Sequence, residues 1–186
     1  AQIANGVRDS RHRIEHIDTL HEDDVLRLAE LGVIASMQPV HPPGSAGLPL
    51  QPTISLMGRQ RWQNAFAWRR IWDSGATIAF ATDWPVSPLN PLYAIQCAMT
   101  RSPWHSDMPD QRLTLSECLQ AYTSNGAYAA FDEQSNGQIA VGKTADLAVI
   151  SGDLIQLTQD DELGLSCVAT ICNGEVVYQE DAFFES

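Results

Sequence analysis

The hydrophobic pattern in the first half of the chain predicts short strands that alternate with helices. Strands are expected where apolar and β-branched residues run together, at 13–17, 33–37 and 77–83. Helical stripes are expected at 19–32, 59–74 and 91–100. Strand, helix, strand repeats of this length are the crossover units of a parallel sheet, so the pattern predicts an α/β fold.

Two stretches carry the Thr-x-x-Glu spacing of a helix N-terminal capping box. The first, Thr19 with Glu22, is expected to open the helix that ends at Gly32. The second, Thr114 with Glu117, is expected to open a helix that continues to about Phe131.

Residues 40–58 are rich in proline and glycine and have no convincing period. A loop of that length inside a compact domain is often a functional lid or a binding loop. Disorder is the competing interpretation.

The last quarter of the chain has the pattern of a small β module. Asn173-Gly174 predicts a hairpin turn between two of its strands. The expected strands are Ile139–Val141, Leu147–Ile150, Val168–Ile171 and Val176–Tyr178. We place the boundary between this module and the α/β part near residues 132–136.

Composition narrows the classes of partner. The 186 residues are 44% hydrophobic and 18% charged, which is a globular composition. A net charge of -12 opposes binding to nucleic acid and to anionic membranes, and no apolar run approaches the ~18 residues of a spanning helix. We therefore expect a small-molecule substrate, with neither a nucleic acid nor a membrane as partner.

Four cysteines without a CxxC pair are expected to be reduced packing thiols, which favours a cytoplasmic location. The chain begins at Ala1 rather than at a methionine. We expect either a trimmed start or a position inside a larger protein.

The candidate chemistry lies where the predicted strands end. Asp83 follows the third strand and His16 ends the first, and the carboxyl ends of parallel strands share one rim, so these two side chains could share a metal ion. His41, after the second strand, could line the same rim and contact substrate. His12 is four residues from His16, ~13 Å along a strand and too far to bind the same ion. The alternatives are a turn or cap aspartate, a core histidine at 16 and an exposed loop histidine at 41.

Three stretches at these strand ends resemble the amidohydrolase superfamily, specifically its amidohydrolase 3 (YtcJ-like) group. They are RHRIEH at 11–16, SMQPVH at 36–41 and ATDWPV at 81–86. The tail at 137–150, GQIAVGKTADLAVI, is similar to the superfamily's G-x-I-x-x-G-K-x-A-D-L segment.

The resemblance implies the C-terminal part of a (β/α)₈ TIM-barrel metal-dependent hydrolase. Residues 1–133 would supply about strands six to eight, and residues 134–186 part of a small, composite β-sandwich. By motif position His16 is the strand-six metal ligand and Asp83 the strand-eight aspartate, which binds the metal and also acts as general base and then proton donor. The implied cofactor is a divalent metal, zinc by family, and the implied substrates are amides, cyclic amides, formamides and related C–N compounds.

The other ligands of the family have no counterpart in this sequence. The H-x-H pair of strand one, the bridging lysine of strand four and the histidine of strand five would lie before Ala1, and Lys143, the one lysine, belongs to the tail motif. We therefore expect a C-terminal part of the enzyme that is inactive alone and has either kept or lost its metal. The alternative is a non-catalytic, self-associating or small-ligand-binding module. In both cases we expect a homo-oligomer or pairing with the missing N-terminal segment, because open sheet edges invite pairing.

Overall fold

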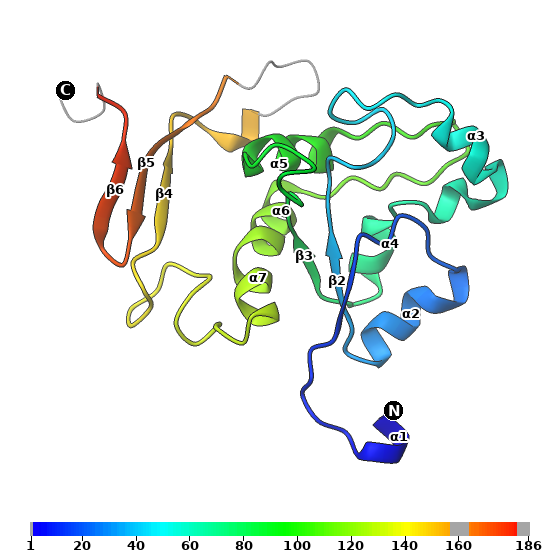
Figure 1. Cartoon of the computed structure of the whole chain (residues 1–186), viewed down its shortest axis with the longest axis horizontal. Coiled ribbons are helices and arrows are strands. Elements are labelled where there is room, and N and C mark those ends of the chain that lie inside the picture. Colours follow the sequence, from blue (N-terminus) through cyan, green and yellow to red (C-terminus); the bar gives the residue numbers. More distant parts are fainter. Residues whose placement is uncertain (1, 157–163, 182–186) are drawn as a thin grey trace.

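A computed structural model of the chain describes residues 2–156 and 164–181. The first half contains α1 (Gln2–Asn5), β1 (Arg13–Glu15), α2 (Glu22–Glu30), β2 (Ile34–Met37), α3 (Thr53–Met57), η1 (Arg59–Asn64), α4 (Trp68–Asp73) and β3 (Ile78–Phe80). The second half contains α5 (Pro91–Thr100), α6 (Leu115–Tyr122), α7 (Ser124–Ala129), β4 (Leu147–Ile150), η2 (Leu154–Gln156), β5 (Cys167–Cys172) and β6 (Glu175–Gln179). Figure 1 shows these elements in chain order.

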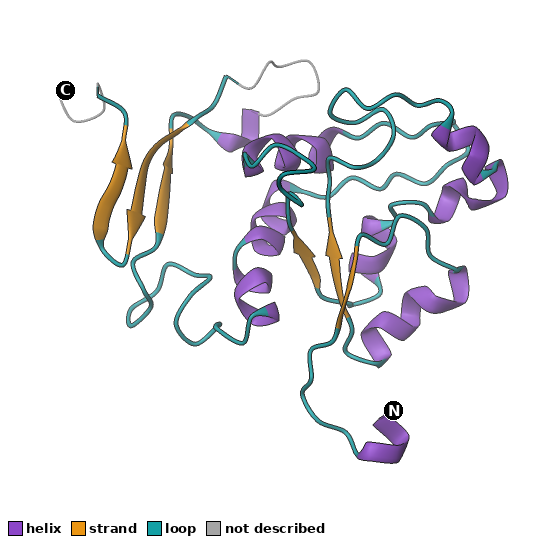
Figure 2. Cartoon of the chain, viewed as in Figure 1, coloured by secondary structure: helices purple, strands orange, loops and turns teal. Residues whose placement is uncertain are grey.

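The first three strands form a parallel sheet in the order β1-β2-β3, which confirms the predicted α/β organisation. Glu15 pairs with Ser36, and Met37 with Phe80. Every residue of β2 is buried, as expected for a central strand with a neighbour on each side. The arrows of the sheet run in the same direction in Figure 2, so their carboxyl ends meet at one edge.

Helices α2, α4, α6 and α7 pack against this sheet. The main hydrophobic core lies between them and includes the fully buried side chains of Trp68, Ile71 and Ile78. All four cysteines are free. Among the described residues, no helix combines the length and apolar character that crossing a bilayer requires.

The C-terminal residues form a separate antiparallel sheet in the order β4-β5-β6, with the predicted turn at Asn173-Gly174. The prediction of a strand at Ile139–Val141 is wrong. Both end residues are exposed, the segment leads into a turn, and none of the described strands pairs with it. All of β6 is exposed as well. Residues 157–163 and 182–186 of the predicted module lie outside the described residues.

Two predicted long helices are each interrupted. Residues 59–74 form the 3₁₀ helix η1 and then α4, because Ala65 pairs with Thr19 in a β-bridge and Phe66 takes a positive φ of 48°. The helix expected from Thr114 to Phe131 breaks at Thr123, whose φ of -116° and ψ of -86° separate α6 from α7.

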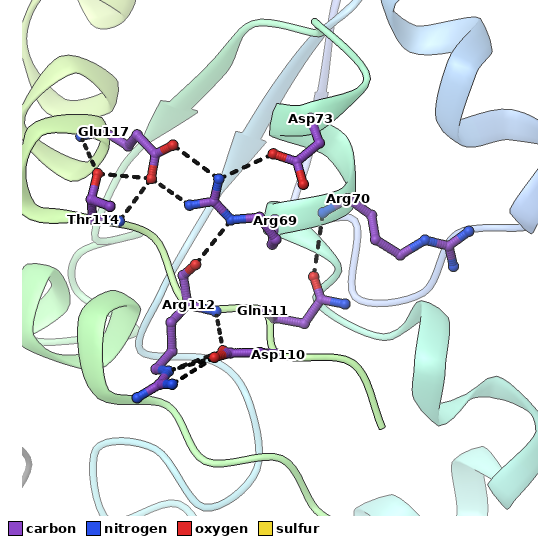
Figure 3. Close-up of polar contacts among 8 residues, drawn as sticks. All are labelled: Arg69, Arg70, Asp73, Asp110, Gln111, Arg112, Thr114 and Glu117. Carbon is purple, nitrogen blue, oxygen red and sulfur yellow. Dashed lines mark hydrogen bonds and ion pairs between the residues drawn. The ribbon is translucent and has the colours of Figure 1, made fainter. Parts of the chain in front are cut away.

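One of the two predicted capping boxes is present. The Thr114 hydroxyl accepts from the Glu117 N–H at 3.3 Å, and the Glu117 carboxylate accepts from the Thr114 N–H at 2.7 Å. Figure 3 shows that Arg69 and its partner Asp73 extend this contact across to α4. The Arg69 hydrogen bonds lower the pKa of Glu117 to about 2.

The other predicted box is wrong. Helix α2 begins at Glu22, and its N-cap is His21, whose Nδ1 accepts from the Asp23 N–H at 3.3 Å. Thr19 lies two residues too early to cap, because its backbone pairs with Ala65 instead.

Replacing Thr114, which caps α6, should therefore lower the free energy of unfolding more than replacing Thr19, which has the same spacing to a glutamate but caps no helix. We expect Thr114→Ala to lower the free energy of unfolding by about 1 kcal/mol, because the Glu117 N–H loses its acceptor. Thr19→Ala is the matched control and should change it by less than about 0.5 kcal/mol. Urea denaturation followed by circular dichroism measures both. Equal losses would show that the box does not stabilise α6.

Candidate metal centre

Three residues that follow the strands of the parallel sheet come together at its carboxyl edge. His16 follows β1, His41 lies four residues after β2, and Asp83 lies three residues after β3. One ligand atom of each lies within 4.8 Å of the others, the geometry of a group able to hold a metal ion. The structure thus brings together the three site residues expected from the sequence.

Hydrogen bonds at the strand ends set these positions. The His16 N–H donates to the Ser36 carbonyl at 2.8 Å, so pairing with β2 continues one residue beyond β1. His16 and Asp83 then take positive φ values of 70° and 56°, a left-handed conformation that histidine and aspartate adopt more often than most residues. The backbone therefore turns sharply at both ends of the group.

Asp83 lies within reach of both histidines. Its Oδ2 is 4.0 Å from His16 Nδ1 and 3.8 Å from His41 Nε2. The two imidazole rings stack with centroids 5.7 Å apart at an interplanar angle of 18°. Two ligands on one tetrahedral zinc ion are ~3.4 Å apart, so each of these two Asp83 pairs would close by about half an ångström, and no ligand pair of the group is wider than 4.8 Å.

Gln38 is a site residue that the sequence reasoning missed. It is buried, and its Oε1 lies 3.0 Å from His16 Nδ1. The same Nδ1 lies 4.0 Å from Asp83 Oδ2, so the Gln38 carbonyl and the Asp83 carboxylate both face this one nitrogen and hold the ring at the group. The signal in the sequence was its place directly after an apolar strand and before Pro39.

His41 has an incomplete set of partners. A turn positions it, because its N–H donates to the Gln38 carbonyl at 3.1 Å. Its side chain is 17% exposed, and Nε2 is buried without a hydrogen-bond partner among the described residues. Burial lowers the pKa of His41, and Asp83 opposes that shift. A buried, neutral imidazole nitrogen without a partner fits a metal or a polar substrate group.

The remaining histidines and the arginine pair lie elsewhere. His12 is exposed outside the group, and His21 and His105 face solvent beside Asp23 and Asp107. Arg69 and Arg70 form ion pairs with carboxylates of other helices, which assigns them to packing.

Sequence comparisons place the chain beside longer proteins. A family model described as "Amidohydrolase family" matches residues 1–178. Protein LONG AFTER FAR-RED 3 of Arabidopsis thaliana is 32% identical over 94% of the chain and 30% of its own length. The putative amidohydrolase YtcJ of Bacillus subtilis is 30% identical over 93% and 33%. The N-substituted formamide deformylase of Arthrobacter pascens is 26% identical over 92% and 31%. The chain thus spans about a third of the length of these relatives.

Solved structures share the fold. An uncharacterized metal-dependent hydrolase from Pyrococcus furiosus aligns with a TM-score of 0.59 and 25% identity, covering 72% of this chain and 26% of that one. Atrazine chlorohydrolase from Arthrobacter aurescens, solved with zinc, aligns with a TM-score of 0.63 and 20% identity over 90% and 36%.

The environment of His41 predicts how it titrates. We expect an NMR midpoint below 6.5, since burial disfavours the imidazolium. Asp83→Asn should lower the midpoint further, because the carboxylate favours the charged ring. Asp110→Asn, which removes a partner of Arg112, is the control and should leave it unchanged. Because the folded protein holds His41 neutral, stability should fall as the pH drops below about 6.5. A midpoint above 6.5 would contradict this account.

Proposed function

This chain belongs to the amidohydrolase family, within its amidohydrolase 3 (YtcJ-like) group, and from that premise we propose that it is the C-terminal part of a metal-dependent hydrolase of non-peptide C–N bonds. In this proposal β1, β2 and β3 are about strands six to eight of a (β/α)₈ barrel. Their parallel order and the one-third coverage of the relatives support this. The sheet of β4, β5 and β6 would be part of a composite β-sandwich, and the exposed Val176, Val177 and Tyr178 support a missing second layer.

We assign the metal to His16, His41 and Asp83. The observation that carries the assignment is the convergence of three donors at the carboxyl edge of the sheet, one of them the partnerless Nε2 of His41. Two imidazoles and a carboxylate suit a zinc ion. His41, expected from the sequence to contact substrate, becomes the third donor in this assignment.

Asp83 has the chemistry of the general base. A divalent ion, when bound, polarises the scissile carbonyl and lowers the pKa of water towards ~7. The Asp83 carboxylate takes a proton from the attacking water as the C–O bond forms and returns it to the nitrogen as the C–N bond breaks. Gln38 orients His16 through its ring nitrogen. The substrate class we propose is a small amide-like molecule, such as the N-substituted formamides named for one relative.

Metal content tests the assignment. After zinc loading and gel filtration, we expect mass spectrometry to find one zinc ion per chain. His16→Ala and Asp83→Asn should each weaken zinc affinity at least about tenfold, because each removes a donor. His12→Ala is the matched control and should retain the metal. Equal zinc content in all four proteins, or none in the unchanged chain, would refute the assignment.

The same samples test the reaction. The zinc-loaded chain alone should not hydrolyse a panel of N-substituted formamides and cyclic amides, because the family's ligands from strands one, four and five are absent from its sequence. Turnover by this chain that Asp83→Asn abolishes would overturn the proposal that other strands must complete the site.

We propose that the isolated chain self-associates through the open edge of β1. His16 N–H and the His12 carbonyl bond to β2, so the N–H groups of Arg13 and Glu15 point away from it. The outer edge of β3 differs, because Asn125 Nδ2 donates to the Ile78 carbonyl there at 2.8 Å. A second copy or the missing barrel strands can pair with β1.

Light scattering after size-exclusion chromatography measures this association. We expect a mass at least twice the 20.4 kDa of the chain. Arg13→Pro should shift the measured mass toward that of the monomer, because proline lacks the N–H group that points away from β2 and that a partner strand would bond. Arg13→Ala keeps this N–H and should leave the mass unchanged. A monomer at every concentration would contradict pairing at this edge.

A further inference from the structure

Arg101, just after α5, is a buried cation held by backbone carbonyls and aromatic rings. It is 7% exposed. Its Nη1 donates to the Phe66 carbonyl at 2.7 Å and its Nη2 to the Ala65 carbonyl at 3.3 Å. The guanidinium carbon lies 4.9 Å from the ring centre of Trp68 and 5.3 Å from that of Trp104. These contacts fix the side chain in one place.

Its charge has no carboxylate partner within 4.0 Å in the described part of the chain. Arg11 and Arg69 differ, because Glu133 and Glu117 raise their pKa values. Burial alone lowers the pKa of Arg101 to about 10. The two carbonyls accept from two of its five N–H donors.

Arg101 lines a cavity of about 380 Å³. The cavity lies between the segment 43–50, helix α5 and the segment 101–104. Its polar walls include the buried Ser45 and Gln96, and its apolar walls include Leu50, Tyr93 and Trp104. A volume of that size and mixed walls are typical of small-ligand sites.

We propose that this cavity binds a small organic carboxylate, with the anionic group on Arg101 and an apolar body against Tyr93, Trp104 and Leu50. A planar guanidinium fork matches a carboxylate, and a buried cation is stabilised by an anion that enters with it. Arg101 is the one arginine among the residues that line the cavity, and the chain as a whole has a net charge of -12. This balance favours a monoanion over a phosphate dianion as the ligand. His16, His41 and Asp83 do not line the cavity, so the site is separate from the proposed metal centre.

Benzoate is the probe, with neutral benzamide and inorganic phosphate as comparisons. The zinc-free chain is titrated by NMR, and the indole N–H of Trp104, which donates to the Pro43 carbonyl at 2.9 Å, is the reporter. We expect benzoate to shift this signal and to bind at least about tenfold more tightly than benzamide, because charge-assisted hydrogen bonds recognise its anion. Phosphate should bind more weakly than benzoate. Equal binding of benzamide, or tighter binding of phosphate, would overturn the proposal.

Variants locate the site. Arg101→Lys keeps the charge but loses the fork and should weaken benzoate binding at least about tenfold. Arg112→Lys, an exposed arginine paired with Asp110, is the matched control and should leave it unchanged. Leu50→Ala alters the apolar wall without changing Arg101 and should weaken benzoate binding severalfold even if Arg101→Lys does not fold. His16→Ala should not affect benzoate, which separates this result from the outcome for zinc. Unchanged benzoate binding in folded Arg101→Lys or in Leu50→Ala would refute the site.

Discussion

Parallel pairing of β1, β2 and β3 is the constraint on which the candidate metal centre depends. The strands are short, and each one delivers its next polar residues to the same edge because all three run in one direction. A shift of one residue in the register would turn each strand's side chains to the opposite face. The buried β2 holds that register, since both of its edges are bonded and its four residues are enclosed.

The sequence was most informative where local chemistry and tertiary structure agree. Asp83 directly after an apolar run, the Thr114 box and the Asn173-Gly174 turn were all predictable, because each depends on a few neighbouring residues. The motifs at the strand ends predicted the family, which the match over residues 1–178 confirms.

The failures have a common physical origin in contacts between distant segments. Thr19 has the spacing of a cap but its backbone pairs with Ala65, 46 residues away in the sequence, and the same bridge interrupts the helix expected at 59–74. The proximity of Gln38 to His16 depends likewise on the pairing of β1 with β2. Periodicity within one segment contains no information about such partners.

The two histidines of the candidate metal centre differ in their exposure to solvent. His41, on the segment that follows the central strand, is 17% exposed, whereas His16, after the edge strand β1, is 48% exposed. The outer edge of β3 is partly occupied by Asn125, but the outward N–H groups of β1 have no such cover among the described residues. A further parallel strand beside β1 would end next to His16 and bring its own polar residues to the exposed face of that ring. The open edge of the sheet and the more exposed histidine of the candidate metal centre therefore lie at the same strand of this chain.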